Sequence, residues 1–213
     1  MNKDFVEECI KKAKEGVSKC TKDILNLEGM TGSMTRHLYN NLCSFNKGNN
    51  DKTRYLEIGC YKGSSTISAL YGNDCQTTVI DNWSEFGGPK DTFYANMQTY
   101  FKDIFNDETI QVINENSFDL KTKPKFRPYD IYLYDGNHSE KCQEEAITYY
   151  WEYLADPCVI LIDDWDWDCA KNGTLRGLEK VNANILHRWD IHQPGGSNGF
   201  WNGCGVFLVS NHT

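Results

Sequence analysis

The sequence predicts an α/β fold built on a mostly parallel sheet with helices on both faces. Short apolar segments that are typical of buried strands alternate with longer segments of helical periodicity. A strand, a glycine-containing turn and a helix follow one another within residues 55–71. Near the C-terminus two strand-like segments follow without a helix between them, which predicts a terminal antiparallel hairpin. At 213 residues the chain is expected to hold one sheet domain with an extension.

The first fifty residues are predicted to be a helical extension to the sheet domain. Residues 4–27 show the apolar spacing of an amphipathic helix, and residues 35–45 predict a second, shorter one. Residues 47–51 form a polar linker. We therefore divide the chain into an extension, residues 1–50, and a sheet domain, residues 51–213. Extensions of this kind often cover a ligand site or dimerise, so a homo-oligomer is one expectation.

The sheet domain is predicted from its alternating segments. Strands are expected at residues 55–58, 77–80, 109–113, 129–134, 158–162, 189–192 and 205–209. Helices are expected at residues 67–71, 93–105, 139–154 and 175–186. Pro157 is expected to end the third of these helices, because proline cannot donate the backbone hydrogen bond that a helix needs.

Composition limits the partners and the compartment. The net charge of −8 argues against nucleic acid, because phosphate binding needs a basic surface. Nine cysteines are scattered without CxxC pairs, and the charged N-terminus lacks an apolar signal segment. No apolar run approaches the ~18 residues of a membrane span. These features predict a cytoplasmic protein with reduced, mostly buried thiols, which binds neither a membrane nor nucleic acid.

The turn after the first predicted strand carries the clearest motif, YLEIGCYKGSS at residues 55–65. Lys62 precedes Gly63, which is the wrong order for a phosphate-binding P-loop, and the G-x-G spacing of a dinucleotide site is missing. An acidic residue followed by G-x-x-x-G resembles motif I of the class I S-adenosylmethionine-dependent methyltransferases. An ordinary glycine turn before a helix is the alternative. The resemblance makes Glu57, Gly59, Gly63 and Ser64 candidate cofactor-binding residues, in a Rossmann-like domain.

Two further positions are candidates for the cofactor. Asp81 follows the second strand, about twenty residues after the glycine turn, where nucleoside-binding folds hold ribose hydroxyls. A surface aspartate at a strand end is the alternative. Asn116 and Ser117 follow the third strand and are expected near the adenine.

Acidic residues also end the fourth and fifth strands, which read YLYDGNH and ILIDDW. Carboxyl ends of parallel strands share one edge of the sheet, so Asp135, Asp163 and Asp164 can converge there. Close carboxylates repel one another and favour a hard cation such as Mg²⁺, or Mn²⁺. The alternative is that Asp163 merely ends its strand while Asp164 faces solvent.

These residues resemble the metal ligands of the metal-dependent O-methyltransferases, of the catechol type and of the macrocin or sugar O-methyltransferase type. The resemblance implies that Asp135, Asp163 and Asp164 bind the metal and that Asp135 also lies near the cofactor. The base in those families lies two or three residues after the first ligand. Asn137 and His138 occupy those positions here; His138 is the candidate base, although it departs from the lysine or aspartate of the families. A histidine that only helps to cap the following helix is the alternative.

The implied function is S-adenosylmethionine- and metal-dependent methylation of a hydroxyl group on a small molecule, with a sugar or glycoside as the expected acceptor. The loops at residues 82–91 and 193–203 and the tryptophans near the strand ends are expected to shape the acceptor pocket. Two alternatives remain. Asp164, Asp166 and Asp168 form the D-x-D pairs of a metal-dependent glycosyltransferase, and a non-catalytic ligand-binding domain could keep the same fold. Thermal stabilisation by each candidate donor would distinguish the two transferases.

Overall fold

The computed structural model describes residues 1–48, 51–106, 108–193 and 199–210. Within these residues the core is a seven-stranded sheet of order β3-β2-β1-β4-β5-β7-β6. The strands are β1 (Thr53–Ile58), β2 (Cys75–Ile80), β3 (Ile110–Ile113), β4 (Tyr129–Tyr134), β5 (Leu154–Asp163), β6 (Asn184–Ile191) and β7 (Cys204–Ser210). The first five are parallel to their neighbours, and β7 lies antiparallel between β5 and β6. The predicted mostly parallel sheet with a C-terminal antiparallel hairpin is confirmed.

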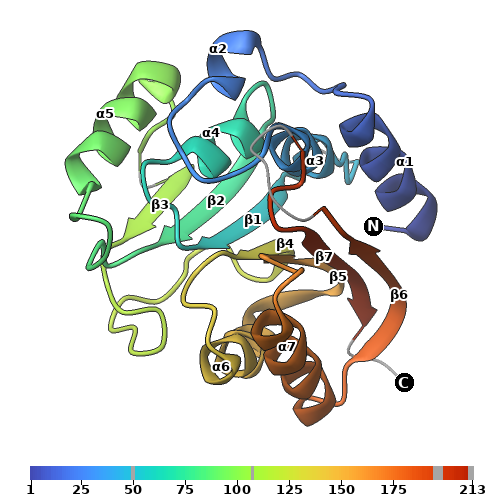
Figure 1. Cartoon of the computed structure of the whole chain (residues 1–213). Coiled ribbons are helices and arrows are strands. Elements are labelled where there is room, and N and C mark those ends of the chain that lie inside the picture. The colour runs from blue at the N-terminus through green and yellow to red at the C-terminus, as the bar shows by residue number, and fades with distance from the viewer. Residues whose placement is uncertain (49–50, 107, 194–198, 211–213) are drawn as a thin grey trace.

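Helices cover both faces of the sheet (Figure 1). One layer holds α1 (Lys3–Lys14), α2 (Lys22–Leu25), α3 (Ser33–Cys43), α4 (Ser64–Leu70) and α5 (Lys90–Phe101). The opposite layer holds α6 (Glu140–Tyr150), the short 3₁₀ helix η1 (Trp151–Tyr153) and α7 (Asp168–Lys180). None of the helices in the described residues is long and apolar enough to cross a membrane.

The period-2 alternation of the strands explains the two layers. Tyr55 on β1 faces the layer of α1 to α5, whereas Leu56 and Ile58 face the layer of α6 and α7. Both faces of the central strands are therefore buried, as expected of a parallel sheet between helices.

Six of the nine cysteines are buried, and all nine are free thiols.

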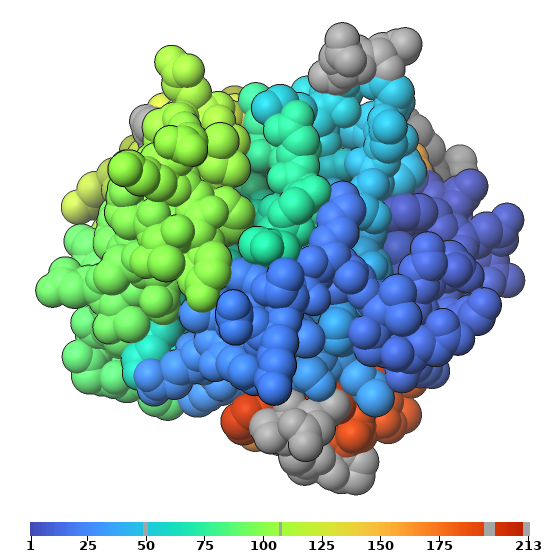
Figure 2. Space-filling model, turned by 90° about the horizontal axis from the view of Figure 1, so that it is seen from above, coloured from blue at the N-terminus to red at the C-terminus, as the bar shows by residue number. Residues whose placement is uncertain are grey.

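The N-terminal helices pack into the same core as the sheet. Val6 of α1 and Leu38 of α3 are fully buried with Ile67 of α4 and the strands below. Seen from above, the N-terminal residues fill the surface between α5 in green and the C-terminal residues in orange (Figure 2). The division at residue 50 remains a prediction, because this packing alone does not show whether residues 51–213 fold without the extension.

The predicted helix over residues 4–27 is wrong in its extent. The structure breaks it into α1 and α2, and Gly16 at the break has a φ of 69°, which a residue with a Cβ rarely adopts. The apolar spacing of the sequence continues across the break, because α1 and α2 both bury residues in the same layer of the fold. This spacing therefore predicted one helix instead of two.

Two boundaries near the C-terminal half are also corrected. The third predicted helix ends at Tyr150, and Pro157 lies inside β5 instead of ending a helix. The helix predicted at residues 175–186 is α7, which begins at Asp168 and ends at Lys180, where Asn182 follows in a left-handed conformation. Residues 184–191 form β6, so the strand predicted at 189–192 begins earlier.

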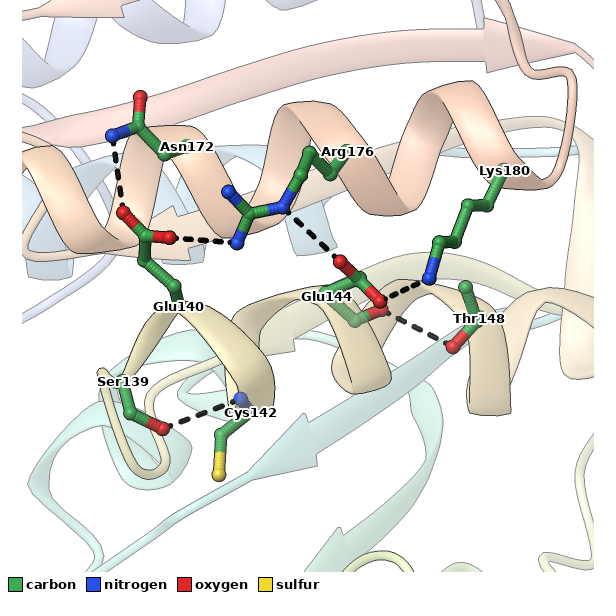
Figure 3. A network of polar contacts seen from close by, with 8 residues as sticks. All are labelled: Ser139, Glu140, Cys142, Glu144, Thr148, Asn172, Arg176 and Lys180. Carbon is green, nitrogen blue, oxygen red and sulfur yellow. Dashed lines mark hydrogen bonds and ion pairs between the residues drawn. The ribbon is translucent and has the colours of Figure 1, made fainter.

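Close packing fixes α6 against α7. A Cβ on Gly173 would lie 2.3 Å from the carbonyl oxygen of Glu140, so only glycine permits this approach. Figure 3 shows Arg176 of α7 donating to Glu140 and to Glu144, both on α6. These ion pairs are exposed and add little stability. They link α7 to α6 at Glu140 and at Glu144. The segments that precede both helices, which carry His138 and Trp167, are thereby held side by side.

Candidate active site

A cavity of about 940 Å³ opens at the carboxyl ends of β1, β2, β4 and β5. This volume accommodates a cofactor and a small acceptor together, since ligand sites of roughly 300–1,000 Å³ are typical. Most of the predicted site residues line it: Gly59, Ser64, Asp81, Asn116, Ser117, Asp135, His138, Asp163 and Asp164. Glu57 and Gly63 are not among the lining residues.

Gly59 allows the ends of β1 and β4 to approach one another. Its φ is 82°, and a Cβ would lie 2.0 Å from the carbonyl oxygen of Asp135. Gly63 has a φ of 87° and caps the N-terminus of α4. Gly59 therefore positions Asp135 as well as the wall of the cavity. A larger residue at position 59 is therefore expected to displace Asp135 before it obstructs a bound cofactor.

Glu57 supports the glycine turn from below. Its side chain is fully buried and accepts hydrogen bonds from the hydroxyl groups of Tyr55 and Ser65. Burial raises the pKa of Glu57 to about 7, against the lowering effect of its hydrogen bonds. Glu57 thus connects the strand to the first turn of α4, and direct contact with a cofactor remains an expectation from the sequence.

Asp81 holds the same turn from the side. Its Oδ2 accepts from the backbone N–H groups of Cys60 (2.9 Å) and Tyr61 (3.0 Å), and Oδ1 accepts from that of Trp83 (2.7 Å). A carboxylate oxygen has two lone pairs, so Oδ2 is fully used by its two donors, whereas Oδ1 can still accept one further hydrogen bond. Asp81 can therefore bind a ribose hydroxyl while it orders both loops.

Asp135 and Asp163 lie together because β4 and β5 are paired neighbours, with Tyr134 opposite Ile162. Their carboxyl groups share a hydrogen bond. Burial first, and then the neighbouring acidic groups, raise the pKa of Asp163 to about 7 and that of Asp135 well above its usual value. The pair consequently holds a proton near neutral pH, as expected of close carboxylates without a cation.

Asp164 completes this acid cluster, defined as Asp135, Asp163 and Asp164. Its φ is 51°, which turns the side chain toward Asn202 Nδ2, at 2.8 Å from Oδ1. Its Oδ2 lies 3.4 Å from His138 Nε2, and Asp135 Oδ1 lies 3.8 Å from the same nitrogen. The alternative in which Asp164 faces solvent is wrong, since the residue is 8% exposed.

The donor chemistry of the acid cluster suits a hard cation, because all its ligand atoms are carboxylate oxygens. Within the described residues, however, no group of three or more His, Cys, Asp or Glu side chains is arranged to hold a metal ion. Asp135 and Asp163 are instead hydrogen-bonded to each other, and Asn202 donates to Asp164. Binding a cation would require these carboxylates to exchange those hydrogen bonds for contacts with the ion.

His138 contacts Trp167 and Gln143. Its ring lies edge-on to Trp167, with centroids 5.4 Å apart, and Nδ1 lies 3.2 Å from Nε2 of the fully buried Gln143. Burial lowers the pKa of His138, against the raising effects of Asp164 and Glu85. The ring is therefore mainly neutral at neutral pH, as a proton acceptor must be.

The aspartates that suggested a glycosyltransferase do not converge. Asp166 accepts hydrogen bonds from His192 Nδ1 (2.6 Å) and Gln193 N (2.9 Å), and Asp168 is the first residue of α7. Neither lines the cavity. Gln193 and residues 199–203 of the last predicted pocket loop are described, whereas residues 194–198 lie outside the described part of the chain.

One wall of the cavity is the strap, defined as residues 27–34 of the N-terminal extension. Sequence analysis suggested that the extension can cover a ligand site but did not identify these residues. Met30 and Thr31 of the strap line the cavity. The buried Arg36 donates to the carbonyl oxygens of Leu27 (2.9 Å) and Thr31 (3.0 Å), and a Cβ on Gly29 would lie 1.8 Å from Ser64 Oγ. The contact between the strap and the glycine turn depends on tertiary packing, which local sequence pattern does not show.

Comparison with known proteins agrees with this geometry. A family model described as a methyltransferase domain matches residues 56–165, which is more than half of the chain and includes the glycine turn and the acid cluster. No curated protein sequence matches.

Solved structures share the fold. A Corynebacterium glutamicum protein has a TM-score of 0.60 at 15% identity, covering 98% of this chain and 91% of that one. The O-methyltransferase from Bacillus cereus, in complex with S-adenosylhomocysteine, has a TM-score of 0.54 at 14% identity, covering 99% and 92%. The O-methyltransferase TomG from Streptomyces achromogenes, involved in tomaymycin synthesis and in complex with S-adenosylmethionine, has a TM-score of 0.55 at 16% identity, covering 95% and 90%. The resemblance to methyltransferases stated from the sequence is thus confirmed, and the chain belongs to the methyltransferase domain family.

Proposed function

We propose that this protein is an S-adenosylmethionine-dependent O-methyltransferase that uses a divalent cation and methylates a hydroxyl group of a sugar or glycoside. The observation that carries the proposal is the meeting of three features in one cavity: the glycine turn, Asp81, and the acid cluster with His138. The two O-methyltransferases of similar fold, one with S-adenosylmethionine and one with its product, support the choice of cofactor and of reaction.

The cofactor would lie along the glycine turn. Gly59 and Ser64, which line the cavity, would form its wall, Asp81 would bind the ribose, and Asn116 and Ser117 would contact the adenine. S-adenosylmethionine supplies an electrophilic methyl group on a positively charged sulfur, and the carboxylates that line the cavity favour such a cation.

The acid cluster would hold Mg²⁺ or Mn²⁺. A divalent cation there supplies positive charge beside the acceptor oxygen and lowers the pKa of that hydroxyl group. Without it, Asp135 and Asp163 keep the proton that they share.

His138 is the proposed proton acceptor, through Nε2, the ring nitrogen that faces the acid cluster. Nε2 can accept a proton only in the tautomer that carries the ring proton on Nδ1. That tautomer needs the Gln143 amide to present its oxygen to Nδ1, half a turn from the orientation in the structure. Thr174, which contacts the amide at 3.2 Å, has a hydroxyl that can donate or accept, so it fits both orientations.

Trp167 and Phe86 provide aromatic faces at the mouth of the cavity, where they are 45% and 66% exposed. Aromatic faces of this kind pack against the C–H faces of sugar rings, which supports a sugar or glycoside as the acceptor.

Metal removal tests the proposal. Methyl transfer from radiolabelled S-adenosylmethionine to a panel of sugars and glycosides is measured in EDTA and after Mg²⁺ is restored. We expect no transfer in EDTA and recovery with Mg²⁺, while the Asp163→Asn variant binds the cofactor without turnover. Full activity in EDTA would refute the role of the cation, and failure of the protein to bind S-adenosylmethionine in calorimetry would refute the whole assignment.

A further inference from the structure

The charges around the cavity restrict the acceptor further than the proposed function does. The lining carries carboxyl groups at Asp81, Glu85, Glu115 and the acid cluster, and within the described residues it includes no lysine or arginine. Residues 49–50, 107, 194–198 and 211–213, which the structure does not describe, contain no lysine or arginine either. No lysine or arginine side chain of the lining is therefore available to pair with an anionic acceptor.

Lysines next to the lining residues in sequence are engaged elsewhere. Lys62 forms an ion pair with Glu28 of the strap and lies over the ring of Tyr61. Lys90 lies over the ring of Trp83, with Nζ 5.9 Å from the centroid. Lys141, which precedes the lining residue Cys142, forms an ion pair with Glu145 on α6. None of these three side chains lines the cavity.

The carboxylates that line the cavity differ in the hydrogen bonds that stabilise their negative charge. Asp81 accepts three backbone hydrogen bonds, as described above. Glu115 accepts from the backbone N–H groups of Lys121 and Thr122 and from the Thr122 hydroxyl, which lowers the pKa of Glu115. Within the acid cluster, Asp135 and Asp163 are hydrogen-bonded to each other and Asp164 accepts from Asn202. Glu85 is left, and its carboxylate makes no hydrogen bond or ion pair within the described part of the chain.

Glu85 lies on the acceptor side of the cavity. It lines the same cavity as His138, together with Phe86 and Trp167. The next residue, Phe86, contacts Tyr61 edge-on with centroids 5.8 Å apart, and Trp167 contacts His138. An unpaired carboxylate among exposed aromatic faces is the combination that binds ammonium groups, by charge and by cation–π contact.

We infer that the acceptor is a hydroxyl compound without anionic groups, and that Glu85 determines specificity by favouring an acceptor that carries an ammonium group. Phosphorylated, nucleotide-linked and carboxylated sugars are excluded as substrates, and amino sugars or similar hydroxylated amines are preferred. This inference rests on the proposed function, because it concerns the acceptor of the same site.

Two series of matched compounds test the inference. The first contains the methyl glycosides of glucosamine, glucose and glucuronic acid; the second contains dopamine, 4-methylcatechol and 3,4-dihydroxyphenylacetate. Binding is measured by calorimetry with S-adenosylhomocysteine and Mg²⁺ present, and kcat and KM are measured where turnover occurs. We expect the ammonium member of a series to bind at least about tenfold more tightly than the carboxylate member, the effect of one favourable charge contact. Equal or tighter binding of the carboxylate member, or no binding of either ammonium compound at millimolar concentration, would overturn the inference.

Variants then test Glu85 itself. Glu85→Lys should reduce the ratio of ammonium to carboxylate affinity by at least about tenfold, mainly through KM. Glu179→Lys makes the same change of charge at the exposed, far end of α7 and should leave the ratio unchanged. If the ratio of ammonium to carboxylate affinity is equal in wild type and Glu85→Lys, Glu85 does not determine specificity.

Calorimetry with S-adenosylmethionine separates the two possible failures. A protein that binds the cofactor but prefers carboxylate acceptors contradicts only the inference on charge. A protein that does not bind the cofactor contradicts the proposed function, and the inference fails with it.

Discussion

Replacing Glu57 by glutamine should change how stability depends on pH. Glu57 is fully buried, and its pKa rises from 4.5 to about 7 on folding. A carboxyl group whose pKa is raised in the folded state holds its proton more tightly there. Its contribution is fully present below the unfolded pKa and is lost as pH rises through the folded pKa, so the affected window runs from 4.5 to about 7.

The size of the effect follows from the shift. Each pKa unit corresponds to about 1.4 kcal/mol, so ionised Glu57 costs the folded state about 3 kcal/mol above this window. Glutamine has nearly the same shape and stays neutral. Of the hydroxyl groups of Tyr55 and Ser65, one can keep donating to its amide oxygen while the other accepts from its NH₂ group. We therefore expect the stability of Glu57→Gln relative to wild type to rise by about 3 kcal/mol between about pH 5 and pH 8.

Urea denaturation of both proteins across this range measures the difference. Asp135 and Asp163 also have raised pKa values, but they titrate in both proteins and largely cancel in the comparison. Glu179→Gln, an exposed change on α7, should give a curve parallel to that of wild type. Parallel curves for Glu57→Gln and wild type would refute the buried, protonated carboxyl group beneath the glycine turn.

Three other substitutions test the site. Asp81→Ala should weaken S-adenosylmethionine binding by about 1.5–3 kcal/mol in calorimetry, the scale of a charge-assisted hydrogen bond; normal affinity would place the ribose elsewhere. His138→Ala should lower kcat by ~10²–10⁴-fold with Mn²⁺ affinity nearly intact, and a normal kcat would exclude it as the base. Gly29→Ala places a Cβ 1.8 Å from Ser64 Oγ and should cost about 1–3 kcal/mol of unfolding free energy; unchanged stability would contradict the packing of the strap.

The sequence predicted the sheet well because its strands are apolar on both faces and lie between turn residues. β4 was placed at residues 129–134 to the residue, since both its ends are marked by a change from apolar to polar side chains. The predicted ends of helices and strands were wrong where tertiary packing determines them. Pro157 fits inside β5 because it lies between Leu154 and Val159, where the pairing with β4 is irregular, whereas the sequence suggested the end of a helix.

The sequence predicted those parts of the candidate site that follow from the order of the strands in the sheet. Once β4 and β5 are neighbours, Asp135 and Asp163 must meet at one edge of the sheet. The position of Met30 in the cavity wall was not predictable, because it depends on the contact of the strap with the glycine turn. Nor could local pattern show that Glu85 lacks a partner, since that depends on every side chain around it.

A crystal structure with S-adenosylhomocysteine and Mn²⁺ tests the central claim most directly, because the anomalous signal of manganese locates the ion independently of the protein. We predict S-adenosylhomocysteine along Gly59–Ser65 with its ribose on Asp81, and an anomalous peak bounded by Asp135, Asp163 and Asp164. A cofactor bound elsewhere, or an acid cluster that keeps its Asp135–Asp163 hydrogen bond without an anomalous peak, would contradict the account.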